Sequence, residues 1–140
     1  MANAFGCCNR RECPQRLFHF AMADLHNLWP ALASINSSRQ TAPFWELPGE
    51  ERRRFTQFCP DYERMYASEG YSLVEPRDAV KGDIARSIMY TVFYYDFPLH
   101  GMGPAMIKWH LEDLPDEWEC ARNDLIEQLQ GTRNPFIGDC

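Results

Sequence analysis

The sequence predicts one mainly helical domain with a long irregular segment in its middle. Three observations support this: apolar residues with helical spacing in the second half, many prolines and glycines between positions 40 and 77, and few stretches that alternate like a strand. A chain of 140 residues fits a single domain, and 45% hydrophobic with 24% charged residues is typical of a folded protein.

Two helices are predicted around the glycine-rich turn at position 101. In Lys81–Phe93, apolar residues recur every three or four positions, which is the pattern of a buried helical stripe. Pro98 closes this segment and Pro104 opens the next. A second helix is therefore expected from about Ala105 to Glu112.

A third helix is predicted to begin at Pro115, a residue favoured in the first helical position. Asp116 and Glu117 follow in the first turn, where the helix dipole favours negative charge. Gly131 suits a left-handed cap at the end of this helix, and the string Gln130–Phe136 is expected to stop the helix and dock the tail. The apolar residues expected to form its buried stripe are Trp118, Ala121, Leu125 and Leu129.

The first half of the chain carries weaker signals. A short helix is expected within Leu28–Ile35, after Pro30. Residues 40–77 are expected to be mostly loop, and strand signals are weak there as elsewhere.

Charge is distributed unevenly along the chain. The net charge of −6 argues, taken alone, against a nucleic-acid ligand. Before position 55, however, seven Lys or Arg stand against five Asp or Glu, whereas seven stand against fifteen after it. A polyanion would therefore prefer the N-terminal third, and arginines scattered over a solvated surface are the alternative. The arginines concerned are Arg10, Arg11, Arg16, Arg39, Arg52, Arg53 and Arg54.

Six cysteines in so short a chain suit a disulfide framework in an oxidising compartment, with the pairing left open. A zinc site would need ligands such as Cys8, Cys13 and His19, but the chain has no CxxC pair and this spacing is poor. Disulfides are therefore the preferred interpretation.

No membrane association is expected from the sequence. The longest apolar run, around positions 88–95, is shorter than a membrane-spanning helix needs. The first residues, MANAFGCCNRREC, lack the charged and then apolar pattern of a secretory signal.

The stretch MADLHNLWPALASIN contains the most suggestive polar residue, Asn36. An amide oxygen is a legitimate ligand of a hard divalent cation such as magnesium, usually beside a carboxylate and water. Arg39, three positions later, would share a helix face with Asn36 and could hold a phosphate. The alternative is that Asn36 and the two serines after it simply end a helix.

His26 is the second candidate in this stretch. Because the ordinary pKa of histidine lies near neutrality, His26 could act as a general base or contact a phosphate. The alternative is a buried histidine whose ring nitrogens are satisfied by backbone carbonyls. Asp24 could orient the ring of His26 or cap a helix.

Three strings of this sequence together resemble the bacterial endonuclease I family: DLHNLWPALASIN, KGDIARSIMY and LPDEWECARNDLIEQLQGTRNPFIGDC. The resemblance covers nearly all of residues 7–140. It implies a nuclease of the ββα-metal (His-Me finger) type decorated with helices and using Mg²⁺ or a similar cation, so the expected fold class is α+β, mainly helical. Asn36 matches the family's metal-binding Asn, and Asp24–Asn27 matches the segment leading into its helix. The family's disulfides also suit the six cysteines, Cys120 and Cys140 among them.

The sequence departs from the family pattern in one respect. The family carries a Glu-His pair on an upstream strand, as metal ligand and general base, and no Glu-His dipeptide occurs in these 140 residues. The chain is therefore expected to be a single endonuclease I-like domain, residues 1–140, that corresponds to the C-terminal two-thirds of the family pattern. The first part of the ββα-metal motif is missing from it. Loss of a general base lowers the rate by about 10²–10⁴.

Three hypotheses on function follow. The first is a metal-dependent, non-specific endonuclease acting on DNA and also on RNA, with Asn36 on the metal and His26 and Arg39 near the phosphate. The second is a catalytically impaired remnant that binds nucleic acid or a protein partner without cleaving. The third is a small disulfide-bonded structural domain. The resemblance further implies a periplasmic or secreted location, and a monomer is expected.

Overall fold

The computed structural model of the chain describes residues 15–49, 53, 55, 57–66, 70 and 72–138. Its contacts divide the chain into two compact units. Unit 1 comprises the chain up to Trp29, the segment Arg86–Leu99 and the chain from Pro115 onward, and unit 2 comprises Pro30–Ala85 and His100–Leu114. The single domain expected from the sequence stays a prediction.

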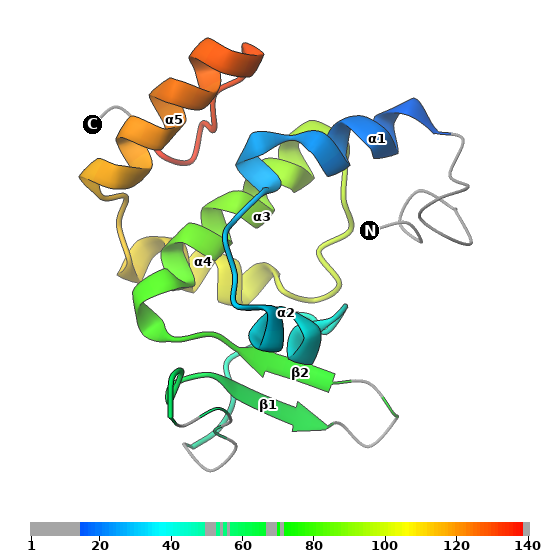
Figure 1. Cartoon of the computed structure of the whole chain (residues 1–140), viewed down its shortest axis with the longest axis vertical. Helices are drawn as coiled ribbons and strands as arrows, with labels where there is room; N and C mark the ends of the chain where they lie inside the picture. The colour runs from blue at the N-terminus through cyan, green and yellow to red at the C-terminus, as the bar shows by residue number, and fades with distance from the viewer. Residues whose placement is uncertain are drawn as a thin grey trace. The chain divides into compact units, whose positions relative to one another are not determined.

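Unit 1 is helical in its described part. It contains α1 (Arg16–Ala23), the 3-10 turn η2 (Leu25–Asn27), most of α3 (Lys81–Tyr95) and α5 (Glu117–Gln130) (Figure 1). A small apolar core forms around Phe18 and Ala21, against which Met22, Tyr95 and Phe97 pack. The helix predicted at Lys81–Phe93 is thus confirmed and extends two residues further.

The start of α5 differs slightly from the prediction. The helix begins at Glu117 rather than Pro115, because Asp116 is its N-cap and accepts a hydrogen bond from the Glu119 N–H at 2.8 Å. The Glu119 side chain in turn accepts from the Asp116 N–H, which completes a capping box. At the other end, Gly131 adopts the predicted left-handed conformation, with φ of 77°.

The buried face of α5 is not the one that apolar spacing predicts. Trp118, Leu125 and Leu129 are 56%, 54% and 68% exposed, and Ala121 is exposed as well. The residues that α5 buries are Glu119, Cys120, Asn123 and Ile126. The prediction was wrong because two polar residues find partners inside unit 1: Glu119 pairs with Arg86, and Asn123 pairs with the backbone of Asn134. Satisfied polar groups of this kind can occupy a core as apolar ones do.

Unit 2 combines short helices with a hairpin. It contains α2 (Ala33–Arg39), the strands β1 (Glu63–Tyr66) and β2 (Ser72–Glu75), the turn η3 (Asp78–Val80), the first residues of α3, and α4 (Gly103–Glu112). The strands pair antiparallel, from Glu63 with Glu75 to Tyr66 with Ser72. The residues buried at the centre of this unit are Ala42, Tyr62 and Val74, with Ile35, Phe44, Phe55 and Cys59 packed against them.

Two predictions for this part of the chain need correction. The expectation of mostly loop between positions 40 and 77 missed the hairpin, whose strands of four residues each are too short for a clear alternating pattern. The helix expected within Leu28–Ile35 is α2, which begins later because Leu32 has an extended backbone and serves as its N-cap. The helix expected at Ala105–Glu112 is confirmed as α4.

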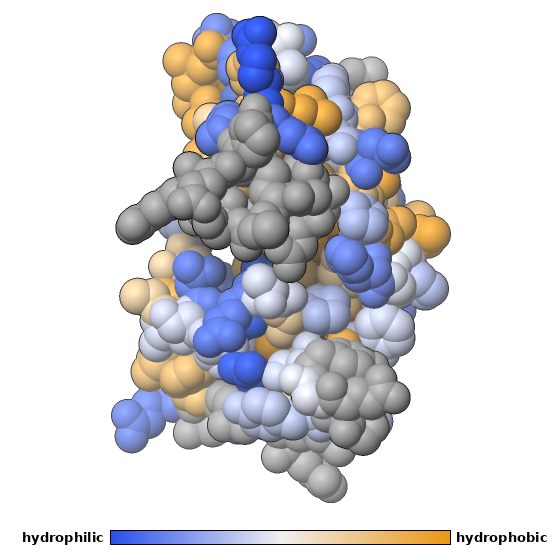
Figure 2. All heavy atoms as spheres, turned by 90° about the vertical axis from the view of Figure 1, so that its right-hand side faces the viewer, coloured by the Kyte–Doolittle hydropathy of each residue, from blue (hydrophilic) through white to orange (hydrophobic). Residues whose placement is uncertain are grey.

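Helices with a small sheet agree with the predicted α+β, mainly helical class, whereas the ββα-metal arrangement stays a prediction. No helix among the described residues has the length and hydropathy to span a membrane. Figure 2 shows hydrophobic and hydrophilic residues interspersed on one face, which is ordinary for protein surfaces. Cys59 carries a free thiol, so a disulfide framework does not include all six cysteines. Cys7, Cys8, Cys13 and Cys140 lie outside the described residues.

Candidate nucleic-acid interface

The α2 helix of unit 2 presents Asn36 to solvent. The backbone carbonyl of Asn36 accepts a hydrogen bond from the Gln40 N–H at 2.9 Å, which closes the last turn of the helix. Its side-chain amide makes no hydrogen bond to any described residue. The amide of Asn36 therefore faces solvent, and α2 ends three residues later at Arg39, so both the metal-ligand role and the alternative of a residue that ends a helix stay predictions.

Arg39, one turn further along α2, is a cation without a counter-ion among the described residues. Its guanidinium lies 4.2 Å from the centroid of the Phe44 ring, and its Nε is buried without a hydrogen-bond partner. Burial lowers the pKa of Arg39 from its usual value. A guanidinium held partly away from water and lacking a carboxylate gains most from an anion that brings acceptor oxygens.

The end of α2 is fixed by residues around the β1–β2 hairpin. Arg64 donates from Nη1 to the Ser38 carbonyl and from Nη2 to the Ser72 hydroxyl, the latter at 2.9 Å. Tyr62 donates from its hydroxyl to the Ser38 hydroxyl at 3.2 Å. These contacts hold the turn that carries Arg39, and they could not be expected from the sequence because the hairpin has no clear local signal. The sequence signal that was available for the hairpin is Val74, an apolar residue with polar residues on both sides of its segment.

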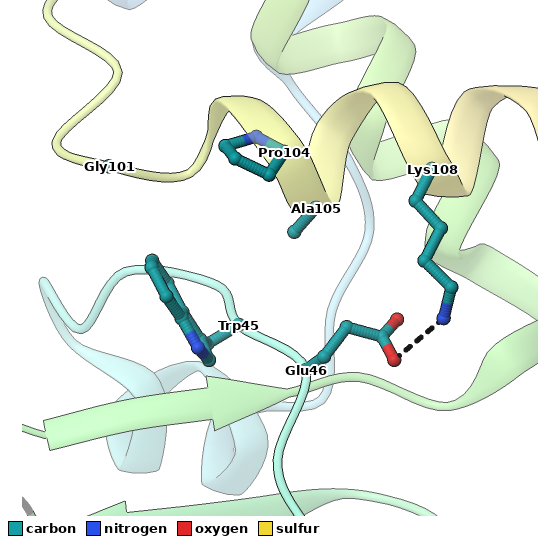
Figure 3. A pocket seen from close by; sticks show the side chains of 6 residues that line it. All are labelled: Trp45, Glu46, Gly101, Pro104, Ala105 and Lys108. Atoms are coloured by element: carbon teal, nitrogen blue, oxygen red, sulfur yellow. Dashed lines mark hydrogen bonds and ion pairs between the residues drawn. The ribbon is translucent and has the colours of Figure 1, made fainter.

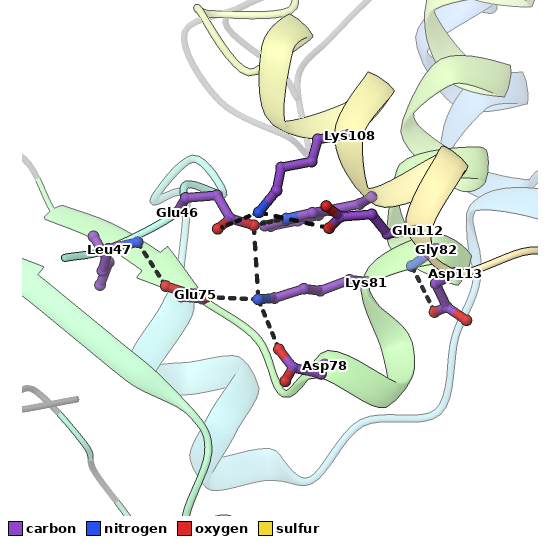
Figure 4. Close-up of polar contacts among 10 residues, drawn as sticks. Glu46, Leu47, Glu75, Asp78, Lys81, Gly82, Lys108, Glu112 and Asp113 are labelled. Carbon is purple, nitrogen blue, oxygen red and sulfur yellow. Dashed lines mark hydrogen bonds and ion pairs between the residues drawn. The ribbon is translucent and has the colours of Figure 1, made fainter. Parts of the chain in front are cut away.

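A network of charged residues of unit 2 surrounds Lys81 (Figure 4). Lys81, at the start of α3, pairs with Glu75 at 2.6 Å, with Asp78 at 2.8 Å and with Glu46 at 3.7 Å. Burial alone would lower the pKa of Lys81, but the hydrogen bonds to Asp78 and Glu75 outweigh it and raise the pKa above its ordinary value. Glu46 also accepts from Lys108 at 2.9 Å. These charges are engaged with one another, so the network is a structural element.

His26 belongs to unit 1 and lies in a different environment. It is 1% exposed, its Nε2 donates to the Thr132 carbonyl at 3.0 Å, and its ring packs against Tyr90 with centroids 4.4 Å apart. Its Nδ1 is buried and has no partner among the described residues. Burial lowers the pKa of His26 and keeps the ring neutral. This is the predicted alternative of a buried histidine with one ring nitrogen on a backbone carbonyl.

Asp24 is the centre of the polar cluster around His26. Its carboxylate is 6% exposed and accepts hydrogen bonds from Tyr95 at 2.5 Å, Tyr90 at 2.7 Å, Gln130 at 2.8 Å and the His26 N–H at 2.9 Å. Burial raises the pKa of Asp24, but these four donors outweigh burial and lower it below the ordinary value. Asp24 caps η2 and ties it to α3 and α5, and it does not touch the ring nitrogens of His26.

Comparison with known proteins gives the ancestry of this chain. The family model for endonuclease I matches residues 2–140. The chain belongs to the endonuclease I family. It is 30% identical over 131 residues to the periplasmic deoxyribonuclease of Aeromonas hydrophila, an alignment that covers 91% of this chain and 53% of that protein.

Two further relatives of this endonuclease I chain have other names. The extracellular ribonuclease of Bacillus subtilis (strain 168) is 31% identical over 133 residues, with 81% of this chain and 43% of that protein covered. Endonuclease-1 of Buchnera aphidicola subsp. Baizongia pistaciae (strain Bp) is 31% identical over 115 residues, with 81% and 45% covered. The chain thus spans about half the length of the curated relatives it matches.

The described residues do not by themselves fit a magnesium site. Mg²⁺ requires near-octahedral oxygen ligands, usually including a carboxylate. Asn36 offers one amide oxygen, and no group of three His, Cys, Asp or Glu that could hold a metal occurs in the described part of this endonuclease I chain. Arg10, Arg11, Arg52 and Arg54, which the sequence marked as part of a basic N-terminal third, lie outside the described residues.

Proposed function

We propose that this chain forms the nucleic-acid-binding part of a non-specific endonuclease, with α2 of unit 2 facing the sugar-phosphate backbone. The proposal depends on two residues that lie three positions apart on α2. The Asn36 amide has no described hydrogen bond, and Arg39 is a partly buried cation that lacks a described anionic partner. Phosphate oxygens provide the bidentate acceptors that a guanidinium fork prefers. Relatives named deoxyribonuclease and ribonuclease support DNA as the substrate and RNA as a second one.

Asn36 would contribute one ligand to a divalent cation, and Mg²⁺ is the cation we assign. A bound divalent cation stabilises the charge that develops on the phosphate and leaving oxygens. Asn36 by itself does not complete the coordination of such a cation. What this chain supplies is Arg39, which holds a phosphate oxygen through a fixed guanidinium, and Asn36, which presents an oxygen one helical turn away.

Plasmid nicking tests the nuclease proposal. Supercoiled DNA incubated with the purified chain and Mg²⁺ should become nicked, and a chelator should stop the reaction. Arg39→Met should lower the nicking rate by about 10²-fold, the size expected when a donor to a developing phosphate charge is removed. The matched control is Arg77→Met, because the Arg77 side chain is exposed and makes no described hydrogen bond or ion pair. Equal loss in both variants, or full activity in Arg39→Met, would remove Arg39 from the site.

The same assay tests the predicted catalytic role of His26. Because His26 is 1% exposed, we expect His26→Gln to nick DNA at the wild-type rate per folded molecule. Folded protein is counted by circular dichroism under the assay conditions. A complete loss of nicking in a fully folded variant would restore His26 as a catalytic residue.

A second candidate function is binding without cleavage, which the absence of a Glu-His dipeptide from these 140 residues favours. In that case duplex DNA should bind with steep salt dependence while Mg²⁺ and Mn²⁺ leave the plasmid intact. A periplasmic or secreted location and a monomeric state suit both functions. The relatives' printed names, periplasmic and extracellular, support the location.

A further inference from the structure

Trp45 differs from the other three tryptophans of the chain. Trp29 and Trp118 contact each other, with ring centroids 5.8 Å apart, and Trp109 is fully buried and contacts Phe44. Trp45 is 38% exposed. Within the described residues, no aromatic ring or cation stacks on its indole, and the indole N–H has no hydrogen-bond partner. An exposed aromatic ring without a partner is free to take one from solution.

The backbone that carries Trp45 is held from both sides. On the side of β2, the Trp45 N–H donates to the Val74 carbonyl at 2.9 Å and the Val74 N–H donates to the Pro43 carbonyl at 3.1 Å. On the side of α4, the neighbouring Glu46 carboxylate accepts from the Trp109 indole and from Lys108. The Trp45 ring therefore projects from an ordered segment, and a ligand that stacks on it need not order the backbone first.

A hollow of about 200 Å³ lies beside the Trp45 ring. Figure 3 shows the ring on one side and Pro104 and Ala105, from the first turn of α4, on the other. Gly101 forms the edge of the hollow with φ of 81°, and a Cβ at this position would lie 3.5 Å from Cζ3 of the ring. Glycine thus keeps open the space next to the ring that any side chain would fill.

The charges at the hollow argue against a phosphate inside it. Lys108 and Glu46, the two charged residues of the wall, pair with each other at 2.9 Å, and Lys108 also pairs with Glu112 at 3.5 Å. The lining therefore offers a flat aromatic face and small apolar groups but no uncompensated positive charge. A flat, uncharged ring suits this combination better than an anion does.

We infer that this hollow is a stacking subsite for an unpaired nucleobase of the nucleic-acid substrate, with Trp45 as the stacking residue. The inference rests on the proposed function, since it names where that substrate places a base. Stacking on an aromatic side chain tolerates every base because each base has a π-face, which suits non-specific recognition. The base must be unpaired, because a base inside a duplex is already stacked on both faces. Arg39 lies over the ring of Phe44, which precedes Trp45 in the chain.

Binding without cleavage tests the inference directly. The affinity of a fluorescently labelled oligo(dT) for the purified chain is measured by anisotropy in a chelating buffer at low salt. Trp45→Ala should weaken binding by about 5- to 150-fold, the size of one base–aromatic stack, whereas Trp45→Phe should retain most of the affinity. The matched control is Trp118→Ala, which removes a more exposed tryptophan of unit 1 and should change the affinity less than about twofold.

The salt dependence separates the base contact from the phosphate contact. Between about 50 and 200 mM salt, Trp45→Ala should keep the wild-type slope of affinity against salt, and Arg39→Met should reduce it by about one unit. An abasic oligonucleotide of the same length should bind wild type and Trp45→Ala equally. Equal oligo(dT) affinity in wild type and Trp45→Ala would overturn the stacking subsite. In that case, nicking of plasmid by the wild type would still leave the proposed function intact. If the wild type neither binds nor nicks, both fail.

A cross-link provides a readout that needs no variant. Irradiation of the wild-type chain with an oligonucleotide containing iododeoxyuridine should attach the base to Trp45, as peptide mass spectrometry would show. Adducts confined to Trp29 or Trp118 would overturn the assignment.

Discussion

Two polar clusters of this protein look alike in the sequence and differ in how their charges are satisfied. Around Asp24 in unit 1, a carboxylate 6% exposed accepts four hydrogen bonds. In α2 of unit 2, the Asn36 amide and the Arg39 Nε have no described hydrogen-bond partner. Satisfied polar groups stabilise the fold that holds them, whereas a guanidinium without a carboxylate beside it can be stabilised by a bound anion.

Arg86 in unit 1 and Arg39 in unit 2 differ in the same way. Arg86 is 1% exposed and holds Glu119 with two hydrogen bonds, at 2.7 Å from Nε and 2.5 Å from Nη2. Its backbone carbonyl accepts from the Asn134 side chain at 3.1 Å. Arg39 has an aromatic ring beneath it and no described carboxylate. The difference indicates a structural role for Arg86 and a binding role for Arg39.

The largest effect should come from breaking the buried pair. Arg86→Met leaves the Glu119 carboxylate charged and without its partner, so the free energy of unfolding should fall by about 3–5 kcal/mol. Urea denaturation followed by circular dichroism measures this loss. The control is Arg133→Met, because Arg133 pairs with Asp124 and Glu127 in an exposed position, where ion pairs contribute about 1 kcal/mol or less. Equal losses in the two variants would contradict the assignment of Arg86 as structural.

A smaller effect with a defined pH dependence is expected at Asp24. Its pKa is lower in the folded than in the unfolded protein, so the stability it contributes is present above the unfolded value of 3.8 and is lost as the pH falls through the folded pKa. Asp24→Asn should therefore lower the unfolding free energy by about 1.5–3 kcal/mol at neutral pH, the size of a hydrogen bond to a charged group. The loss should shrink toward low pH.

The matched control for Asp24 is Asp124→Asn, which removes a carboxylate whose side chain is 57% exposed. Urea titrations of both variants at a series of pH values provide the comparison. A loss at Asp24→Asn that stays constant below the folded pKa would show that the donors, rather than the charge, are responsible.

The sequence was sufficient for elements whose local signals agree with their environment. The helix at Lys81–Tyr95 follows apolar periodicity. Gly131 ends α5 because the residue at this position has a left-handed backbone conformation, which glycine adopts readily. The hairpin was missed because strands of four residues are defined by pairing across the chain rather than by local pattern. The buried face of α5 was misassigned because Arg86 and Asn134, distant in sequence, satisfy its polar residues.

The candidate site shows the same limit. Local sequence could not separate His26 from Asn36, since both are polar residues in one apolar stretch. What distinguishes His26 is its hydrogen bond to the Thr132 carbonyl, which lies 106 residues away in the sequence. The role of Trp45 could not be predicted from the sequence. The hollow beside its ring is formed by Gly101 and α4, which are distant in the chain, and the proline- and glycine-rich segment itself does not indicate which aromatic ring stays exposed.

The smallest effect on stability is expected at Arg39, and it decides the comparison. Arg39 has no described hydrogen bond or ion pair to lose, and removing its unpaired buried Nε offsets the lost cation contact with Phe44, so Arg39→Met should change the unfolding free energy by less than about 0.5 kcal/mol, in either direction. Methionine keeps an apolar stem over the Phe44 ring while removing the charge. Urea denaturation beside Arg86→Met gives the measurement. A loss as large as that of Arg86→Met would mean that Arg39 belongs to the fold, and a neutral result with weakened DNA binding means that its charge is kept for an anion.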